Sequence, residues 1–389
     1  MALLTIPTTE LGFEYDLELE PWSKKLQGYR TIGQWRFPLE GGLGLGFNFL
    51  HQYDYCGWVD TIPQALLRAT EDYPEFQYQM LWLAANSLAA MQLLEARPML
   101  LALVCNKHRV DNRQAFAMCR LGQKQILSKL GLDGTKAALK FIDKLALDFS
   151  KGDEVEQVKR MLNPLDKRYL RLRHYSTVDY TALRLDQIFP FLSGGLLGRS
   201  LIKQGSIVQR VRLSEFQDAI QLGIALGIDG PLDVISNQRS LDKFRELHDR
   251  WAIRNNRWTS QVESGGDIDW DAPYEIALNG NDLIKPIINY RQLHREGTEQ
   301  IHCIAVYHHR IKGGRYLAFQ MHQPQRLTIG IRRKPQGTFP FEIDQICAKR
   351  NRPPNEESKA LIHRWFEQCK QNEKAGSTAQ SFLSSNQQE

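Results

Sequence analysis

The stretch EQIHCIAVYHHRIKGG, residues 299–314, concentrates side chains that can do chemistry. Histidine and cysteine are metal ligands, histidine is a general base near neutral pH, and cysteine is a nucleophile when its thiol ionises. Three interpretations follow from the spacing: a metal site, a thiol-based active site, or a buried structural element.

A zinc site needs about four nitrogen or sulfur ligands in tetrahedral geometry. Cys303 precedes a pair of histidines, and Cys347 lies on a strand expected nearby, but no standard ligand spacing is present. If residues 300–311 are helical, His302 and His309 share a face while Cys303 points elsewhere. We therefore predict no metal-ligating residue and no cofactor, and leave a divalent metal open.

A thiol nucleophile needs a base within hydrogen-bond reach and a lowered pKa. His302 adjoins Cys303, but neighbouring residues on a helix do not face each other. The base would then come from elsewhere, and His248 is one candidate.

The structural interpretation places Cys303 and Tyr307, four residues apart, on one helix face against a sheet. A buried free cysteine behaves as a small apolar residue. On residue chemistry alone this interpretation is favoured, and it leaves the exposed histidines available for binding.

The elements expected to position this stretch are mainly helices. Residues 1–62 are predicted to be irregular or β-containing, and 259–285, rich in Gly, Asp, Asn and Pro, to be a linker or flap. Between them, residues 63–258 are predicted to form a helical domain. Apolar spacing of three and four predicts its helices near 63–72, 74–95, 98–106, 111–130, 134–149, 153–162, 165–173, 179–204, 213–225 and 238–253.

The character of the chain then changes. Residues 286–370 are predicted to be a small domain with a helical start at 286–311, strands at 315–322, 326–333 and 338–348, and a helix at 354–370. A disordered polar tail is predicted at 371–389. The fold class is thus α+β: a large all-α N-terminal and central scaffold, then a small α+β domain with a short antiparallel sheet.

Charge is unevenly distributed. The net charge is +6, but residues 286–370 contain 15 Lys/Arg against 7 Asp/Glu, a balance of +8, so the remainder is slightly acidic. A locally basic domain favours anionic partners, nucleic acid first, and a solubilising surface is the alternative. A second basic stretch, residues 167–175, suits a phosphate-contacting helix face or, more commonly, a charged helix exterior.

Composition restricts the cellular setting. The six cysteines include no CxxC pair, and the acidic N-terminus does not resemble a secretory signal. The most apolar stretch, 80–104, is interrupted by polar and charged residues, so two core helices are expected rather than a membrane span. We expect reduced thiols in a cytoplasmic protein with no membrane partner.

The C-terminal motifs resemble the PcfJ-like family. That family shows an EG–HCV–Y helix, a short sheet, a Q-x-RG-x-N segment and an acidic helix ending near a Trp. The corresponding residues here are Glu296, Gly297, His302, Cys303, Ile304, Tyr307, Gln345, Arg350, Asn351 and Trp365. The resemblance covers roughly residues 63–370 and is specific over 296–353. It departs where QICAKRN lacks the Gly after the basic residue and where Ala305 replaces the usual Gly after HCV.

PcfJ-like proteins are encoded on conjugative plasmids, integrative elements and phages, and the resemblance implies an association with DNA processing or transfer. The leading hypothesis is a DNA- or RNA-associated accessory protein of a mobile genetic element, with partners among proteins of a transfer or defence complex. Its predicted phosphate contacts are Arg310, Lys312, Arg315, Arg332, Arg333, Lys334, Lys349, Arg350 and Arg352.

Two alternatives belong to other classes. The first is a nuclease or other hydrolase, whose pocket would be lined by His302, Cys303, Tyr307, Gln345 and Asn351. The second is a protein-interaction scaffold that uses the helices of residues 63–250.

Overall fold

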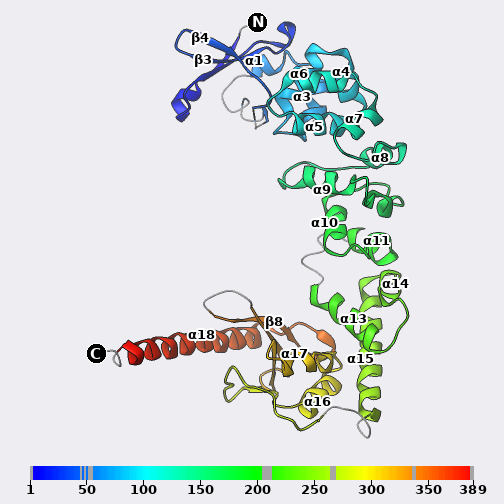
Figure 1. The fold of residues 1–389 in the computed structure, drawn as a ribbon, viewed down its shortest axis with the longest axis vertical. Coiled ribbons are helices and arrows are strands. Elements are labelled where there is room, and N and C mark those ends of the chain that lie inside the picture. The colour runs from blue at the N-terminus through cyan, green and yellow to red at the C-terminus, as the bar shows by residue number, and fades with distance from the viewer. Residues whose placement is uncertain are drawn as a thin grey trace. The chain divides into compact units, whose positions relative to one another are not determined.

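Two antiparallel four-stranded sheets and a majority of helices make the fold α+β, as predicted (Figure 1). The computed structural model describes residues 3–43, 46–47, 50, 56–203, 213–262, 269–334 and 339–385. The chain divides into two compact units. Unit 1 comprises Met1–Gly194 with Ile202–Gly205, and unit 2 comprises Gly195–Leu201 with Ser206–Glu389.

Unit 1 begins with a sheet that is more regular than the sequence indicated for residues 1–62. Strands follow chain order: β1 (Leu4–Ile6), β2 (Asp16–Leu19), β3 (Gly28–Ile32) and β4 (Trp35–Pro38). Gly33, at φ 58°, occupies a left-handed position in the β3–β4 turn. Trp58 Nε1 donates to Leu19 O at 3.1 Å and Tyr78 OH to Leu26 O at 2.9 Å, so helical residues hold the end of β2 and the segment that leads to β3.

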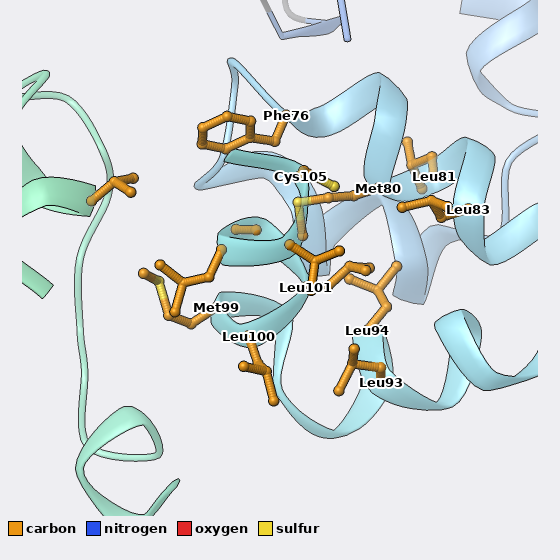
Figure 2. Packing of buried hydrophobic residues seen from close by; sticks show 14 of the residues in the cluster. Phe76, Met80, Leu81, Leu83, Leu93, Leu94, Met99, Leu100, Leu101 and Cys105 are labelled. Atoms are coloured by element: carbon orange, nitrogen blue, oxygen red, sulfur yellow. The ribbon is translucent and has the colours of Figure 1, made fainter. Parts of the chain in front are cut away.

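The helices of unit 1 pack around a shared core, to which α3, α4 and α5 contribute Met80, Leu94 and Leu101, all fully buried (Figure 2). The run predicted at 74–95 divides at Ser87, whose Oγ accepts the Ala90 N–H as an N-cap. The helices are α1 (Cys56–Val59), α2 (Gln64–Glu71), α3 (Gln77–Asn86), α4 (Leu88–Ala96), α5 (Pro98–Lys107), α6 (Asn112–Cys119), α7 (Gln123–Lys129), α8 (Lys136–Ile142), α9 (Glu154–Met161), η4 (Arg168–Leu172) and α10 (Tyr180–Ile188). The next helix, α11 (Leu196–Lys203), lies mostly in unit 2.

The predicted single helical domain, 63–258, requires correction. Its last helices, α13 (Leu213–Ala225), α14 (Pro231–Ser236) and α15 (Leu241–Val262), belong to unit 2. They pack on one another, with the Phe216 and Phe244 rings 4.6 Å apart. They also bond to the C-terminal elements: the Tyr307 hydroxyl donates to Asp218, and His294 Nε2 lies 2.9 Å from Asn256 O. The boundary therefore lies near residues 195–206, not at 258.

The second sheet confirms the three predicted strands and adds one. Its order is β5 (Ile284–Pro286), β6 (Tyr316–Met321), β7 (Leu327–Arg333) and β8 (Phe341–Cys347), all antiparallel. Side chains alternate between the two faces. One face carries Leu317, Phe319, Ile329 and Ile331 and packs under the final helix, whose Trp365 ring lies 4.9 Å from Phe319. The other face carries Tyr316, Thr328, Gly330, Gln345 and Cys347.

The helix predicted at 286–311 is broken into α16 (Tyr290–Gln300), η5 (Ile304–Tyr307) and α17 (His308–Lys312). Ile301 adopts a left-handed conformation, φ 55°, and ends α16 by donating its N–H to Gly297 O. Contrary to our expectation, Cys303 and Tyr307 therefore do not lie on one face of a continuous helix.

Two further predictions differ from the structure. Part of the 259–285 linker is folded: α15 continues to Val262, and Tyr274 and Leu278 are buried, while 263–268 lie outside the described residues. The final helix, α18 (Glu356–Ser385), continues through most of the tail predicted to be disordered at 371–389. That segment contains no proline, so no residue in it removes a backbone donor from the helix.

The turn after β8, η6 (Lys349–Asn351), is strained. Arg350 (φ 59°, ψ 39°) and Asn351 (φ 55°) are both left-handed, which costs a non-glycine residue about 1–2 kcal/mol. Arg350 thus holds a conformation that glycine adopts freely, in the segment where the resembled motif has a Gly that this chain lacks.

We predict that Arg350→Gly raises the free energy of unfolding by about 1 kcal/mol, because the relieved strain exceeds the added entropy of the unfolded chain. Lys349→Gly, at the adjacent position with negative φ, should instead destabilise. Urea unfolding measures both. Equal destabilisation by the two substitutions would contradict strain at Arg350.

Candidate functional site

A buried carboxylate lies at the centre of the 302 region. Asp218, on α13, is 4% exposed and accepts hydrogen bonds from the Tyr307 hydroxyl and from the Cys303 thiol. Burial raises the pKa of Asp218, and these two hydrogen bonds offset part of that shift. Burial and the neighbouring Asp218 raise the pKa of both Cys303 and Tyr307. Thiolate at Cys303 is therefore scarce at neutral pH, which opposes a nucleophilic role.

His302 belongs to a second buried network. Its Nε2 lies 2.7 Å from Thr328 Oγ1, and the Thr328 hydroxyl donates to Glu296, so the imidazole is the donor to Thr328. Arg326 Nη1 also donates to Glu296, at 3.0 Å. Burial lowers the pKa of His302 to about 3, so the ring stays neutral in the fold. In the unfolded chain the imidazole takes up a proton below about pH 6.5, and in the fold it does not. The free energy of unfolding therefore decreases as the pH falls from about 6.5 towards 3.

The structure brings together four of the five predicted catalytic residues. His302, Cys303, Gln345 and Asn351 line one cavity, with Ile304, Thr328, Gly330 and Cys347. Its volume is about 10 Å³, the space of roughly one water molecule. Tyr307 lines a different and larger cleft. The cavity therefore has no room for a substrate.

His248, the base considered for Cys303, is also buried beside this cluster and close enough to Asp218 to influence its pKa. Its Nε2 has no hydrogen-bond partner among the described residues, and the Cys303 thiol donates to Asp218 instead. Within the part of the chain that the structure describes, no group of three or more His, Cys, Asp or Glu side chains could hold a metal ion.

We predict that Cys303 resists alkylation in the native protein, because it is buried and its thiol is protonated. Among the five cysteines whose burial the structure describes, the partly exposed Cys369 should react first. Mass-mapped alkylation at neutral and alkaline pH, with and without denaturant, measures both thiols. Rapid native modification of Cys303 with a depressed apparent pKa would reinstate a thiol-based active site.

We predict that Arg326→Ala lowers the free energy of unfolding by about 3 kcal/mol, because it leaves the Glu296 carboxylate, 1% exposed, without its cation. The matched control is Arg295→Ala, whose pair with Glu299 is largely exposed and should cost no more than about 1 kcal/mol. Denaturant unfolding compares them. Equal losses in the free energy of unfolding would show that burial of Glu296 does not determine the cost of removing its cation.

A second and larger feature of unit 2 is a basic cleft of about 720 Å³. All nine predicted phosphate-binding residues are exposed, and five of them line this cleft. The other four, Lys312 on α17 and Lys349, Arg350 and Arg352 at η6, do not. The lining residues are Gln217, Tyr307, Arg310, Arg315, Tyr316, Arg332, Arg333, Lys334, Pro340 and Asp344.

The five cations differ in their partners. Glu342 binds both Arg332 Nε (2.8 Å) and Lys334 Nζ (2.9 Å), and Asp344 lies 3.5 Å from Arg332. The remaining three, Arg310, Arg315 and Arg333, form no ion pair with any residue the structure describes. The Arg310 guanidinium lies 5.0 Å from the Tyr307 ring centre, and Arg333 lies 5.9 Å from that of Phe341.

Two tyrosines form the floor of the cleft and link it to the buried cluster. The Tyr307 and Tyr316 ring centres are 4.6 Å apart. Tyr316 OH donates to Asp344 (3.1 Å) and accepts from Gln345 Nε2 (3.2 Å). A side chain at Gly330 would clash, since its Cβ would lie 1.9 Å from Tyr316 OH.

Sequence reasoning missed Gln217, Asp218, Tyr316 and Asp344. A signal existed for Asp218, which falls among the buried Phe216, Ala219 and Leu222 of an otherwise apolar helix face. A carboxylate in such a position needs a partner.

Two arginines of the second basic stretch, residues 167–175, form ion pairs within unit 1. Arg168 and Arg171 both pair with the buried Asp186, at 3.4 Å, together with Arg160 at 2.8 Å. These arginines neutralise a buried carboxylate, so the contacts give this stretch a structural role.

The comparisons with known proteins agree with the motifs. Residues 215–362, which contain the buried cluster and the cleft, match the family model of the PcfJ-like protein. The predicted resemblance is confirmed for this region, 148 of the 389 residues. No curated protein and no solved structure matches the chain. Among the described residues, no helix combines the length and apolarity needed to cross a bilayer.

Proposed function

Taking residues 215–362 as a PcfJ-like region, we propose that the protein binds nucleic acid through the phosphate backbone in the basic cleft of unit 2. It acts as an accessory protein of a mobile genetic element, in DNA processing, transfer or defence, within the cytoplasm and beside other proteins of such a complex. The observation that carries the binding proposal is the gathering of five exposed cations in one cleft. The mobile-element setting rests on the family.

The chemistry of the cleft suits phosphate. Four of its five cations are arginines, whose planar guanidinium donates two parallel hydrogen bonds to phosphate oxygens. Three of these arginines have no acidic partner among the described residues, so phosphate would not have to displace one. Such contacts give affinity that falls with salt and carries little base sequence information.

Glu342 and Asp344 support the same proposal in a second way. An arginine is long and flexible, and fixing it for a ligand costs side-chain entropy. The pairs from Glu342 to Arg332 and Lys334 fix two cations before a ligand arrives. The carboxylates also weaken indiscriminate binding of small anions, since each anion meets a partly neutralised site.

We predict that Arg310→Ala and Arg333→Ala each weaken binding of a short DNA or RNA about tenfold at roughly 50 mM salt, because each removes a charged hydrogen-bond donor. Lys359→Ala, on α18 and outside the cleft, removes the same charge and should leave affinity nearly unchanged. Fluorescence anisotropy measures all four proteins.

Two results would contradict the proposal. Wild-type protein could bind neither DNA nor RNA at low salt, where phosphate contacts are strongest. Alternatively, Lys359→Ala could weaken binding as much as the cleft substitutions do, which would assign the affinity to net charge. The hydrolase alternative gains no comparable observation, because its predicted residues enclose a cavity of only about 10 Å³.

A further inference from the structure

The shape of the basic cleft bears on the kind of nucleic acid it would hold. Its volume, about 720 Å³, lies within the roughly 300–1,000 Å³ of pockets that enclose small ligands. Proteins that read duplex DNA usually present a protruding helix or a pair of strands to a groove. A concave cleft suits a strand that can bend and turn its bases aside, as in grooves that track single strands.

The cations come from two segments that the backbone joins at the cleft. Arg310 and Arg315 flank the turn at Gly313 and Gly314. Arg332 and Arg333 end β7, and Lys334 follows directly. Arg333 N donates to Arg315 O at 3.1 Å, which holds the two segments side by side. The unpaired arginines therefore form one group rather than a stripe along a surface.

The neutral polar groups of the cleft are mostly engaged already. The Tyr307 hydroxyl donates to Asp218, and the Tyr316 hydroxyl joins Asp344 and Gln345. Gln217, on α13, is exposed, lines the cleft and makes no hydrogen bond to a described residue. An amide carries both a donor and an acceptor, as base edges do.

We infer that the cleft takes a single-stranded segment of nucleic acid in preference to a duplex, with phosphates on Arg310, Arg315 and Arg333 and a base edge on Gln217. This inference rests on the proposed function and specifies its ligand. Charge alone would favour a duplex, because a duplex has the higher density of phosphates and releases more counterions per contact. A preference for single strands must therefore come from the shape of the cleft.

The test compares two fluorescein-labelled oligonucleotides with equal numbers of phosphates, an unstructured single strand and a fully paired hairpin, by anisotropy with the full chain at roughly 50 mM salt. We expect the single strand to bind at least about tenfold tighter. Gln217→Ala should weaken single-strand binding several-fold and leave hairpin binding unchanged. Gln371→Ala, an exposed glutamine on α18, is the matched control.

The outcomes distinguish failure of the single-strand inference from failure of the proposed nucleic-acid binding. Equal or tighter binding of the hairpin would overturn the single-strand inference and leave nucleic-acid binding in the cleft standing. Binding of neither oligonucleotide would overturn both. Single-strand preference that survives Gln217→Ala unchanged would overturn the role of Gln217 as the base contact.

Discussion

Asp218 and Glu296 are carboxylates that the fold removes from water, and unit 2 is arranged around that constraint. An ionised group in the interior must have hydrogen bonds and opposite charge, or it destabilises the fold by several kcal/mol. Tyr307 and Cys303 donate hydrogen bonds to Asp218, while Arg326 and Thr328 donate hydrogen bonds to Glu296. The motif residues that appear chemically active in sequence are mostly the partners of these two acids. Cys303 and Tyr307 keep their protons and His302 stays neutral, so all three can donate hydrogen bonds within a structural network.

The cleft depends on the same network. Asp218 holds Tyr307, and the Tyr307 ring lies beneath Arg310 and beside Tyr316. On the facing sheet, Gly330 leaves the space that the Tyr316 hydroxyl occupies. A buried polar cluster thus supports an exposed basic surface, and the two features belong to one structural unit with different roles.

Local features were predictable from sequence, and distant pairings were not. The three strands between residues 315 and 348 follow from apolar alternation, because one face must pack under α18. The bond from Tyr307 to Asp218 spans 89 residues, and no local pattern indicates it. The break at Ile301 was missed because a β-branched residue in a left-handed conformation runs against its own preference.

For the candidate site, the exposure of the cations follows from their chemistry, whereas their positions relative to one another do not. Lysines and arginines stay in water, so all nine predicted cations are on the surface. Which five share a cleft depends on the β7–β8 pairing and on the turn after α17, and composition cannot show this. Gln345 and Asn351 line the same cavity as Cys303, and that cavity is too small for a substrate.

The division of the chain near residues 195–206 has an evolutionary consequence. Each unit has its own sheet and its own helices, and the family match begins at residue 215, just inside unit 2. A unit that satisfies its buried acids and apolar faces internally can be fused to a different N-terminal neighbour without any change to its core. Genes that exchange segments could therefore conserve unit 2 while replacing unit 1, and the two halves of this protein need not share an ancestry.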